Sequence, residues 1–279
     1  MHGVMSLLAT TWVYMVHNPS PSALIGHSGF VGTTLLRQRS FECIYRSTNI
    51  AEMRNKSFGL VVCCGAPAQK WLANKEPQKD RDNIQSLIDN LQTIEAKTFV
   101  LISTVDVHTA PVGVDESTLI DESSLQPYGL HRRHLERFVE QQFSNHLIVR
   151  LPGLVGPGLK KNVLFDLLNE NNLNVVDSRG TFQFYPMVSL WEDLQAALSY
   201  DLRLLHLTAE PLSVREIAEK AFGLEFKNEL SGPVASYDMR SRYGHLFGGS
   251  GPYQYTRKES LLAIRNYAQS EPHTMRGNG

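Results

Sequence analysis

Short apolar runs alternate with longer amphipathic segments over residues 22–151. The short runs are nearly continuous and rich in Val, Ile, Leu and Phe, which is typical of strands that are covered on both faces. A strand followed by a helix, repeated along a chain, predicts βαβ units and a parallel sheet. We expect strands at residues 22–25, 42–45, 59–64, 98–103 and 146–151, with helices at 31–38, 81–96 and 128–142.

Beyond residue 157 the pattern becomes less regular. Ser213 is followed three residues later by Glu216, which predicts a capped helix that runs through Lys220. Gly, Ser and Tyr are frequent between residues 231 and 251, so this segment is expected to be a loop. Further helices are expected at residues 163–169, 192–200 and 258–269, with a short apolar run at 204–208.

The whole pattern predicts an α/β fold, a Rossmann-type doubly wound parallel sheet with a smaller, partly helical C-terminal substrate lobe. The Rossmann domain is expected at residues 22–157, and the substrate lobe mainly at residues 158–279, interleaved in part with the first. Residues 1–21 are interpreted as an N-terminal extension, and translation from Met15 is the alternative. Their apolar stretch would reach only about 20 Å as a helix, short of the roughly 30 Å core of a bilayer. No basic residue precedes that stretch, so neither a membrane span nor a secretory leader is expected.

Composition argues against several classes of protein. The 279 residues carry 27 basic and 28 acidic side chains, so no electrostatic attraction to nucleic acid is expected. Cysteines number only three, and adjacent Cys63 and Cys64 would point to opposite faces of a strand, so we expect reduced thiols in a cytoplasmic protein. His131 and His134 share a helical face, but two imidazoles alone make a poor zinc site, and no metal site is predicted.

A glycine-containing segment, Gly26-His27-Ser28-Gly29-Phe30-Val31-Gly32, directly follows the first expected strand. Glycines at this spacing let the chain turn tightly into a helix, so that backbone N–H groups approach a pyrophosphate at the positive end of that helix. The same spacing also occurs in ordinary tight turns, but here the strand, the turn and the helix agree. The predicted dinucleotide contacts in this segment are Gly26, Ser28, Gly29, Phe30, Val31 and Gly32.

Arg46 lies at the end of the second expected strand, twenty residues after Gly26. A site for NAD usually has Asp or Glu there, where the carboxylate binds the ribose hydroxyls. A guanidinium can instead bind a 2′-phosphate through two parallel hydrogen bonds, so Arg46 favours NADP as the cofactor, with NAD as the alternative. The other interpretation of Arg46 is a solvated loop arginine.

The order of these motifs resembles that of the extended short-chain dehydrogenase/reductase family, whose NAD-dependent epimerases, dehydratases and reductases often act on nucleotide sugars. The resemblance covers residues 22–216. Besides the glycine turn it rests on five further segments. Three of them are Cys64-Gly65-Ala66-Pro67-Ala68, Asp82-Asn83-Ile84 and Pro127-Tyr128-Gly129 with Glu136. The other two are residues 99–107, as a strand that ends in a catalytic Ser/Thr, and residues 150–158, as a loop near the nicotinamide. It implies further cofactor contacts at Gly65, Ala66 and Pro152.

The resemblance implies that Thr104, Tyr128 and Arg132 are catalytic. A phenol has a pKa near 10, so Tyr128 exchanges a proton near neutral pH only if a nearby positive charge stabilises the phenolate. The family has Lys four residues later on the same helical face, whereas this chain has Arg132. A guanidinium keeps the charge and can hold ribose hydroxyls, which makes Tyr128 and Arg132 cofactor contacts as well, but it does not shuttle a proton. The alternative is a surface face on which Tyr128, Arg132 and Glu136 only stack and pair.

Three observations bear on the substrate. Thr104 would hold the substrate oxygen beside Tyr128. Dehydratases of the family carry Asp-Glu after the catalytic threonine, whereas this chain has Val105 and Asp106, so water elimination is disfavoured and Asp106 is either a substrate contact or a loop acceptor. The family's Arg-Asp-aromatic clamp for pyrophosphate is replaced by Arg179-Gly180-Thr181, while Lys160, Lys161 and Asn162 either contact phosphate or are solvated.

The leading hypothesis is an NADP-dependent reductase or epimerase that acts by hydride transfer on a small molecule, a nucleotide-linked or modified sugar. A ketone reductase of secondary metabolism is one alternative, because the substrate lobe is short and the clamp is missing. A catalytically inactive NADP-binding regulatory protein is the other, because Arg132 replaces Lys. By analogy alone, the helices expected at 81–96 and 128–142 would form a homodimer.

Overall fold

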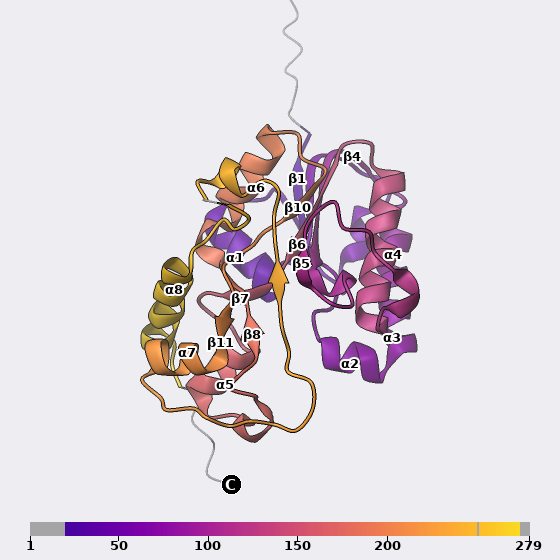
Figure 1. Cartoon of the computed structure of the whole chain (residues 1–279). Helices are drawn as coiled ribbons and strands as arrows, with labels where there is room; N and C mark the ends of the chain where they lie inside the picture. Colours follow the sequence, from indigo (N-terminus) through magenta and orange to yellow (C-terminus); the bar gives the residue numbers. More distant parts are fainter. Residues whose placement is uncertain (1–19, 250, 274–279) are drawn as a thin grey trace, which may run out of the picture.

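A six-stranded parallel sheet forms the centre of the computed structural model, which describes residues 20–249 and 251–273. The strand order is β10-β6-β4-β3-β1-β2, and every neighbouring pair is parallel. The order reverses at β1, where doubly wound sheets bind their ligands. The predicted α/β fold with a Rossmann-type sheet is therefore confirmed (Figure 1). The strands are β1 (Ser22–Ile25), β2 (Cys43–Tyr45), β3 (Ser57–Cys63), β4 (Glu95–Thr104), β6 (His146–Leu151) and β10 (Leu204–His206).

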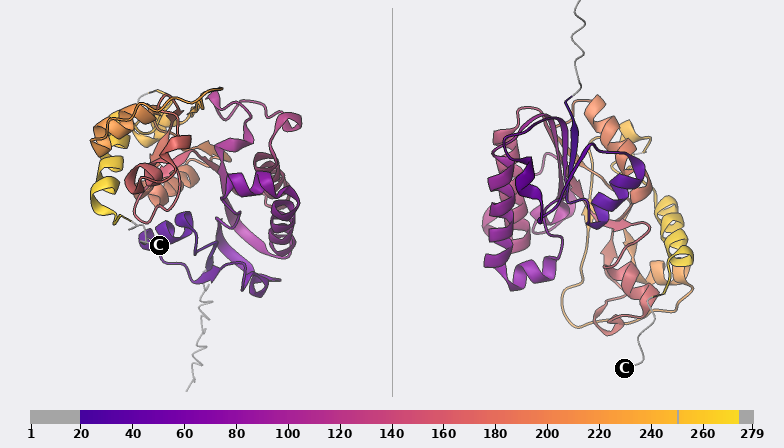
Figure 2. Two further views of the ribbon diagram at one scale, coloured as in Figure 1. Left: turned by 90° about the horizontal axis from the view of Figure 1, so that it is seen from below. Right: turned by 180° about the vertical axis from the view of Figure 1, so that it is seen from behind.

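Helices cover both faces of the sheet and create two apolar layers (Figure 2). One layer lies under α3 (Pro77–Leu91) and α4 (Pro127–Gln142), and it includes the fully buried Phe99. The other lies under α1 (Phe30–Gln38) and α6 (Leu190–Ser199). Because strands covered on both faces must be apolar throughout, β3 and β4 have the continuous runs seen in the sequence.

The smaller lobe has its own apolar core beside the C-terminal edge of the sheet. It is built from short strand pairs and helices that contribute buried Leu, Val and Ile side chains, and Phe30 of α1 packs against it. The sixth strand of the central sheet, β10, also comes from beyond residue 157. The lobe's elements are β7 (Gly153–Val155), α5 (Val163–Asn169), η4 (Leu173–Val175), β8 (Thr181–Phe182), β9 (Phe184–Pro186), η5 (Met187–Ser189), β11 (Leu212–Ser213), α7 (Val214–Ile217), η6 (Ala218–Phe222) and α8 (Arg257–Ser270).

A late segment of the chain returns to the first half of the molecule. Strand β12 (Asp238–Met239) pairs with β5 (Val112–Val114), which follows β4 after the short turn η2 (Val105–Val107). In Figure 1 the long connection that carries β12 runs across the front of the molecule. The prediction of a plain loop at residues 231–251 is therefore wrong, since this segment contains both β12 and the turn η7 (Gly244–Phe247).

Several predicted boundaries also need correction. The helix expected at 81–96 begins earlier, with proline at its first turn, and ends at Leu91, because Glu95 already pairs with Ser57 in the sheet. The cap at Ser213 is confirmed, since its hydroxyl accepts the Glu216 N–H at 3.2 Å, but the helix continues as a π-type turn from Ala218. The predicted extension at residues 1–21 lies outside the described residues except for its last two. Among the described residues, no helix is both long and apolar enough to cross a membrane.

Candidate functional site

The glycine turn after β1 has a geometry that side chains would block. Gly26 has φ +84°, and a Cβ there would lie 2.4 Å from the Cys64 carbonyl oxygen. A Cβ on Gly32 would lie 2.3 Å from the Gly26 carbonyl oxygen. The turn is closed by the Gly29 N–H, which donates to the Gly26 carbonyl at 3.1 Å. The backbone of β1, β3 and α1 therefore meets at distances that only glycine permits.

The first turn of α1 presents donors without a cap. No side chain caps the helix at Gly29, and no acidic residue lies in its first turn. The N–H groups at the start of any helix lack acceptors within it, so those of Phe30, Val31 and Gly32 point out of the first turn at its positive end. Ser28 and Gly29 are exposed, and the nearest atom to a Cβ on Gly29 would be 3.5 Å away. This open, positively polarised cradle fits a diphosphate.

Arg46 lies beside this cradle. The Gly26 N–H donates to the carbonyl of Tyr45 at 2.8 Å, so the residue after β2 comes next to the turn. Arg46 is exposed, and its Nε donates to Thr48 Oγ1 at 3.0 Å. This hydrogen bond within the loop after β2 holds the guanidinium near the end of that strand. The structure thus brings together the turn and the arginine that the sequence singled out.

Tyr128 is held by α2 (Lys70–Lys75) and by the end of β4. Its backbone N–H donates to Asn74 Oδ1 at 3.0 Å. Hydrogen bonding by the Thr104 side chain is among the causes that lower the pKa of the Tyr128 phenol. Only 8% of Tyr128 is exposed. Burial raises the pKa of the phenol, and the Asp106 carboxylate adds to this, while the Arg132 and Lys70 cations oppose it. Thr104 therefore lies close enough to Tyr128 to influence its ionisation, and the catalytic role of the two residues stays a prediction.

Arg132 stacks on the ring of Tyr128, but its guanidinium donates its hydrogen bonds to other groups. Its guanidinium carbon lies 3.9 Å from the centroid of the phenol ring. Its two terminal nitrogens bind both carboxylate oxygens of Asp80, one of them at 2.9 Å, and also the carbonyls of Tyr128 and Pro67. Arg132 is 3% exposed, and its Nε has no partner within the described residues. The sequence did not predict Asp80 as the counter-ion, because the two residues lie far apart in the chain.

Asp106 joins Thr104 to two residues that the sequence did not single out. The Asp106 N–H donates to Thr104 Oγ1 at 3.2 Å. The Asp106 carboxylate binds Lys70 Nζ at 2.6 Å and the hydroxyl of Tyr237 at 3.2 Å. Gly129 makes this packing feasible, since a Cβ there would lie 2.0 Å from the Asp106 carbonyl oxygen. No local pattern marks Tyr237, because it comes from the segment expected to be a plain loop.

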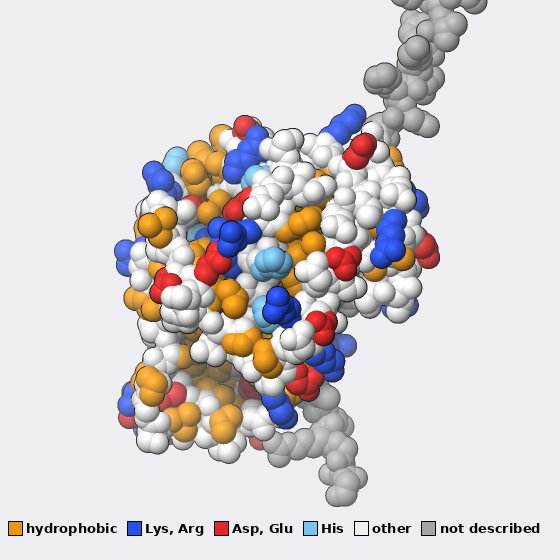
Figure 3. Space-filling view, turned by 90° about the vertical axis from the view of Figure 1, so that its right-hand side faces the viewer, with side chains coloured by type: hydrophobic (Ala, Val, Ile, Leu, Met, Phe, Trp, Pro, Cys, Tyr) orange, Lys and Arg blue, Asp and Glu red, His pale blue; other side chains and the backbone are white. Residues whose placement is uncertain are grey.

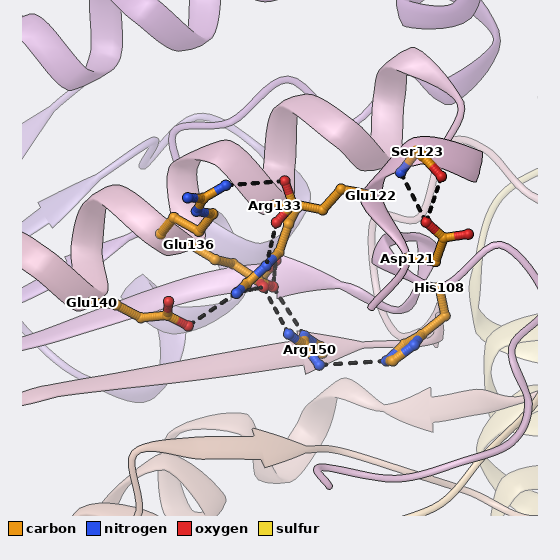
Figure 4. A network of polar contacts seen from close by, with 10 residues as sticks. His108, Asp121, Glu122, Ser123, Arg133, Glu136, Glu140 and Arg150 are labelled. Atoms are coloured by element: carbon orange, nitrogen blue, oxygen red, sulfur yellow. Dashed lines mark hydrogen bonds and ion pairs between the residues drawn. The ribbon is translucent and has the colours of Figure 1, made fainter. Parts of the chain in front are cut away.

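A buried ionic network anchors α4 under this corner (Figure 4). Glu136 is fully buried and binds Arg150 at 2.8 and 3.0 Å and the Ser103 hydroxyl at 2.6 Å. Arg150 in turn approaches Nε2 of His108 at 3.4 Å and of His206 at 3.2 Å. Burial, reinforced by the Arg150 charge, lowers the pKa of each imidazole to about 4. Glu136 therefore ties the Tyr128 helix to the strands, rather than only pairing along a surface.

The remaining predicted contacts occupy the edges of the same region. Gly65 lies against β1, where a Cβ would be 3.1 Å from Ile25 Cγ2, and Ala66 packs on the neighbouring core. Pro152 is buried between β6 and β7. Asn162 caps α5, accepting the Leu164 N–H at 2.9 Å and donating to the Leu154 carbonyl at 3.0 Å, so its amide already has local partners.

Two cations near the smaller lobe also have partners. Lys161 Nζ donates to the Ala68 carbonyl across the gap between the lobes. Burial lowers the pKa of Lys161, and the Arg132 charge adds to this. Arg179 binds Asp177 and the Leu230 carbonyl, each at 2.7 Å, and is thereby tied to its own turn.

Solved structures with the same fold include a UDP-galactose 4-epimerase and complexes with NADPH or NAD. No family model matches the chain, and no curated protein sequence matches it. A UDP-galactose 4-epimerase is 17% identical and has a TM-score of 0.67, covering 89% of this chain and 97% of its own. RMD from Pseudomonas aeruginosa, solved with NADPH, is 16% identical with a TM-score of 0.69, covering 90% and 99%. WbmG from Bordetella bronchiseptica, solved with NAD, is 11% identical with a TM-score of 0.71, covering 92% and 96%. About nine tenths of the chain therefore share the fold of these three structures.

Proposed function

We propose that the chain is an NADP-dependent reductase or epimerase that acts on a nucleotide-linked or modified sugar by hydride transfer. One observation carries the proposal: the open glycine turn follows β1 and Thr104 ends β4, so both lie at the C-terminal edge of the same parallel sheet, beside the helix whose first turn carries Tyr128. Doubly wound sheets bind ligands at that edge. The neighbours named above, solved with NADPH or NAD on the same fold, support this cofactor class.

The residues of the turn fit the cofactor. The N–H groups of Phe30, Val31 and Gly32 would hold its diphosphate, and Arg46 would bind the 2′-phosphate of NADP. Gly65 and Ala66, with Pro152 opposite, would border the path toward the reactive ring. When bound, the cofactor supplies or accepts the hydride.

The chain's own contribution to the reaction is the handling of one proton. Tyr128 Oη would give a proton to the substrate oxygen during reduction and take it back during oxidation. Thr104 Oγ1 would hold that oxygen beside the phenol, whose pKa it lowers. The Arg132 charge stabilises the phenolate through the stacked ring, although the Asp80 carboxylate offsets part of that charge.

The ribose contact that the resemblance implies for Arg132 requires a rearrangement. Both terminal nitrogens of Arg132 are bonded to Asp80 or to backbone carbonyls, so they would have to leave these partners to reach a ribose. The same observation favours a second candidate, a catalytically inactive NADP-binding regulatory protein. A ketone reductase remains the other alternative, and activity on an apolar ketone that lacks a nucleotide would identify it.

A Tyr128→Phe variant tests the leading proposal. The change keeps the buried ring and its stacking with Arg132 but removes the proton donor, so we expect at least a roughly 100-fold loss of kcat with NADPH binding retained. Isothermal calorimetry with NADPH and NADH, followed by assays on a panel of sugar nucleotides, measures both quantities. NADPH binding without turnover of any sugar or ketone would instead support the regulatory candidate. If neither NADPH nor NADH bound, the enzyme proposal would be refuted.

We further propose a homodimer and a reducing, cytoplasmic compartment. Helices α3 and α4 leave a shallow groove lined by Gln85, Ile88, His134 and Phe138. Figure 3 shows this side of the molecule, on which apolar side chains lie among charges of both signs. Sedimentation velocity measures the oligomeric state, and a monomer at micromolar concentration would contradict the dimer.

The proposed reducing, cytoplasmic compartment is supported by the cysteines, all of which are free thiols.

A further inference from the structure

The face of α2 that carries Lys70 is docked on the helix of the catalytic tyrosine. Lys70 and Asn74 are four residues apart in α2 and therefore share a face of the helix. Asn74 Oδ1 accepts the Tyr128 N–H at 3.0 Å, which joins this face to the first turn of α4. Lys70 consequently extends from the same face toward the end of β4, where Thr104 and Asp106 lie.

The ammonium of Lys70 is fixed by two partners from distant parts of the chain. Its Nζ lies 2.6 Å from Asp106 Oδ1 and 3.1 Å from the Tyr237 hydroxyl, which itself donates to Asp106 Oδ1 at 3.2 Å. Tyr237 is in turn held by stacking on Phe182, with ring centroids 5.5 Å apart. These three polar groups form a closed triangle at the mouth of the site. Lys70 is 45% exposed, whereas Asp106 is 18% exposed.

Asp106 connects this triangle to the end of β4. Asp106 Oδ2 accepts from Thr104 Oγ1 at 3.4 Å, a long contact that the 3.2 Å bond from the Asp106 N–H reinforces. The Asp106 carbonyl oxygen would lie 2.0 Å from a Cβ on Gly129, so the same residue packs against the first turn of the Tyr128 helix. Lys70 is therefore joined through Asp106 both to Thr104 and to the turn that carries Tyr128.

Charges of both signs surround Tyr128, and Lys70 is paired with one of them. Arg132 faces the phenol ring from α4, but Asp80 compensates it. Asp106 faces the hydroxyl from η2 and would disfavour a phenolate unless a cation compensated it in turn. Lys70 provides that cation from α2, while Lys161, from the loop after β7, interacts with Arg132. Without Lys70, the Asp106 carboxylate would lose the cation that pairs with it.

Lys70 stays protonated in this arrangement. Burial alone would lower the pKa of Lys70, but the Asp106 carboxylate and the Tyr237 hydroxyl raise it above its usual value. An ammonium that holds its proton so firmly acts by its charge and does not itself transfer a proton.

We propose that Lys70, fixed by Asp106 and Tyr237, is a positioning residue that supplies the stabilising ammonium charge for the Tyr128 phenolate, at a place in the chain far from residue 132. The proposal deepens the proposed function and rests on Tyr128 being its acid and base. The proposal gives the site a lysine, which position 132 lacks. It assigns Asp106 to holding that lysine rather than to contacting substrate.

The test measures ionisation at Tyr128 alone. A difluorinated tyrosine, which ionises near neutral pH, replaces Tyr128, and fluorine NMR follows its titration in otherwise unaltered protein, in Lys70→Met and in Lys70→Arg. Lys79→Met is the matched control, because Lys79 lies on α3 and is 68% exposed and paired only with Glu76. Circular dichroism checks folding, and Lys70→Gln is the second neutral variant in case the methionine destabilises the chain.

We expect Lys70→Met to raise the phenol pKa by roughly one unit, Lys70→Arg to restore most of that shift, and Lys79→Met to leave the titration unchanged. Equal titration curves for the parent, Lys70→Met and Lys70→Gln would overturn the proposal. NADPH calorimetry on the parent protein runs in parallel. Because the fluorine titration needs neither cofactor nor substrate, a lack of NADPH binding would remove the proposed function without deciding the role of Lys70.

Discussion

The two halves of the candidate site are built in opposite ways. The cradle for a diphosphate comes from one continuous segment, Gly26 to Gly32, and its geometry depends on backbone approaches of 2.3 and 2.4 Å to a would-be Cβ. The corner around Tyr128 is assembled from α2, β4, α4 and the late segment that carries Tyr237. The cradle depends on the absence of side chains, whereas the corner depends on contacts between side chains. A single substitution in the cradle should therefore strongly reduce cofactor affinity, whereas a single substitution in the corner should weaken the site only in part.

Gly26→Ala is the change with the largest expected effect. The new Cβ would meet the Cys64 carbonyl at 2.4 Å, and the residue has φ +84°, so the turn must open. We expect NADPH affinity, measured by calorimetry, to fall by about 100-fold or more. Gly223→Ala is the matched control, with φ +68° but nothing within 4 Å, and it should cost only about 1 kcal/mol of stability. Retention of parental affinity in Gly26→Ala would show that the turn does not hold the cofactor.

Acid should weaken the corner through its histidines. Burial holds the pKa of His206 at about 4 in the folded protein, below the ordinary value of 6.5. The unfolded chain binds more protons between these two values, so stability is complete above about pH 6.5 and is lost as the pH falls toward 4, by about 3 kcal/mol for this residue. Urea unfolding at a series of pH values measures the slope.

The control for this prediction is a histidine on the surface. His206→Asn should flatten the slope between pH 6.5 and 4, and His245→Asn, at an exposed position, should leave it unchanged. The asparagine variant also loses packing, so its stability at neutral pH is expected to be lower. An unaltered slope in His206→Asn would mean that the buried network tolerates a charged imidazole.

Arg46→Gln is expected to have the smallest effect and sharpens the comparison on the side of the cradle. Arg46 is exposed and bonded only locally, so its loss should leave folding intact. We expect NADPH affinity to fall about tenfold, while NADH affinity changes little, because only the former carries the 2′-phosphate. Competitive calorimetry with the two dinucleotides decides this, with Lys97→Gln as the surface control. Equal losses for both would leave Arg46 without a role in cofactor choice.

The same contrast explains what could be predicted from the sequence. The sheet and the glycine turn follow from patterns that extend over neighbouring residues, and the strand at residues 146–151 was predicted at both ends. The roles of Tyr128 and Thr104 come from the resemblance of their motifs and stay predictions. The ion pair of Arg132 with Asp80 joins residues 52 positions apart. Lys70 and Tyr237 meet across 167 positions. A single sequence carries no periodicity or spacing that marks such partners, because only packing brings them together.

Strand β12 fixes where Tyr237 lies. Its two residues alternate, with Asp238 half-buried and Met239 buried, and Tyr237 directly precedes them. A shift of its pairing with β5 by one residue would exchange the two faces and withdraw the tyrosine from the lysine. The register of a two-residue strand in the last quarter of the chain thus sets the position of a side chain that binds Asp106, just after β4.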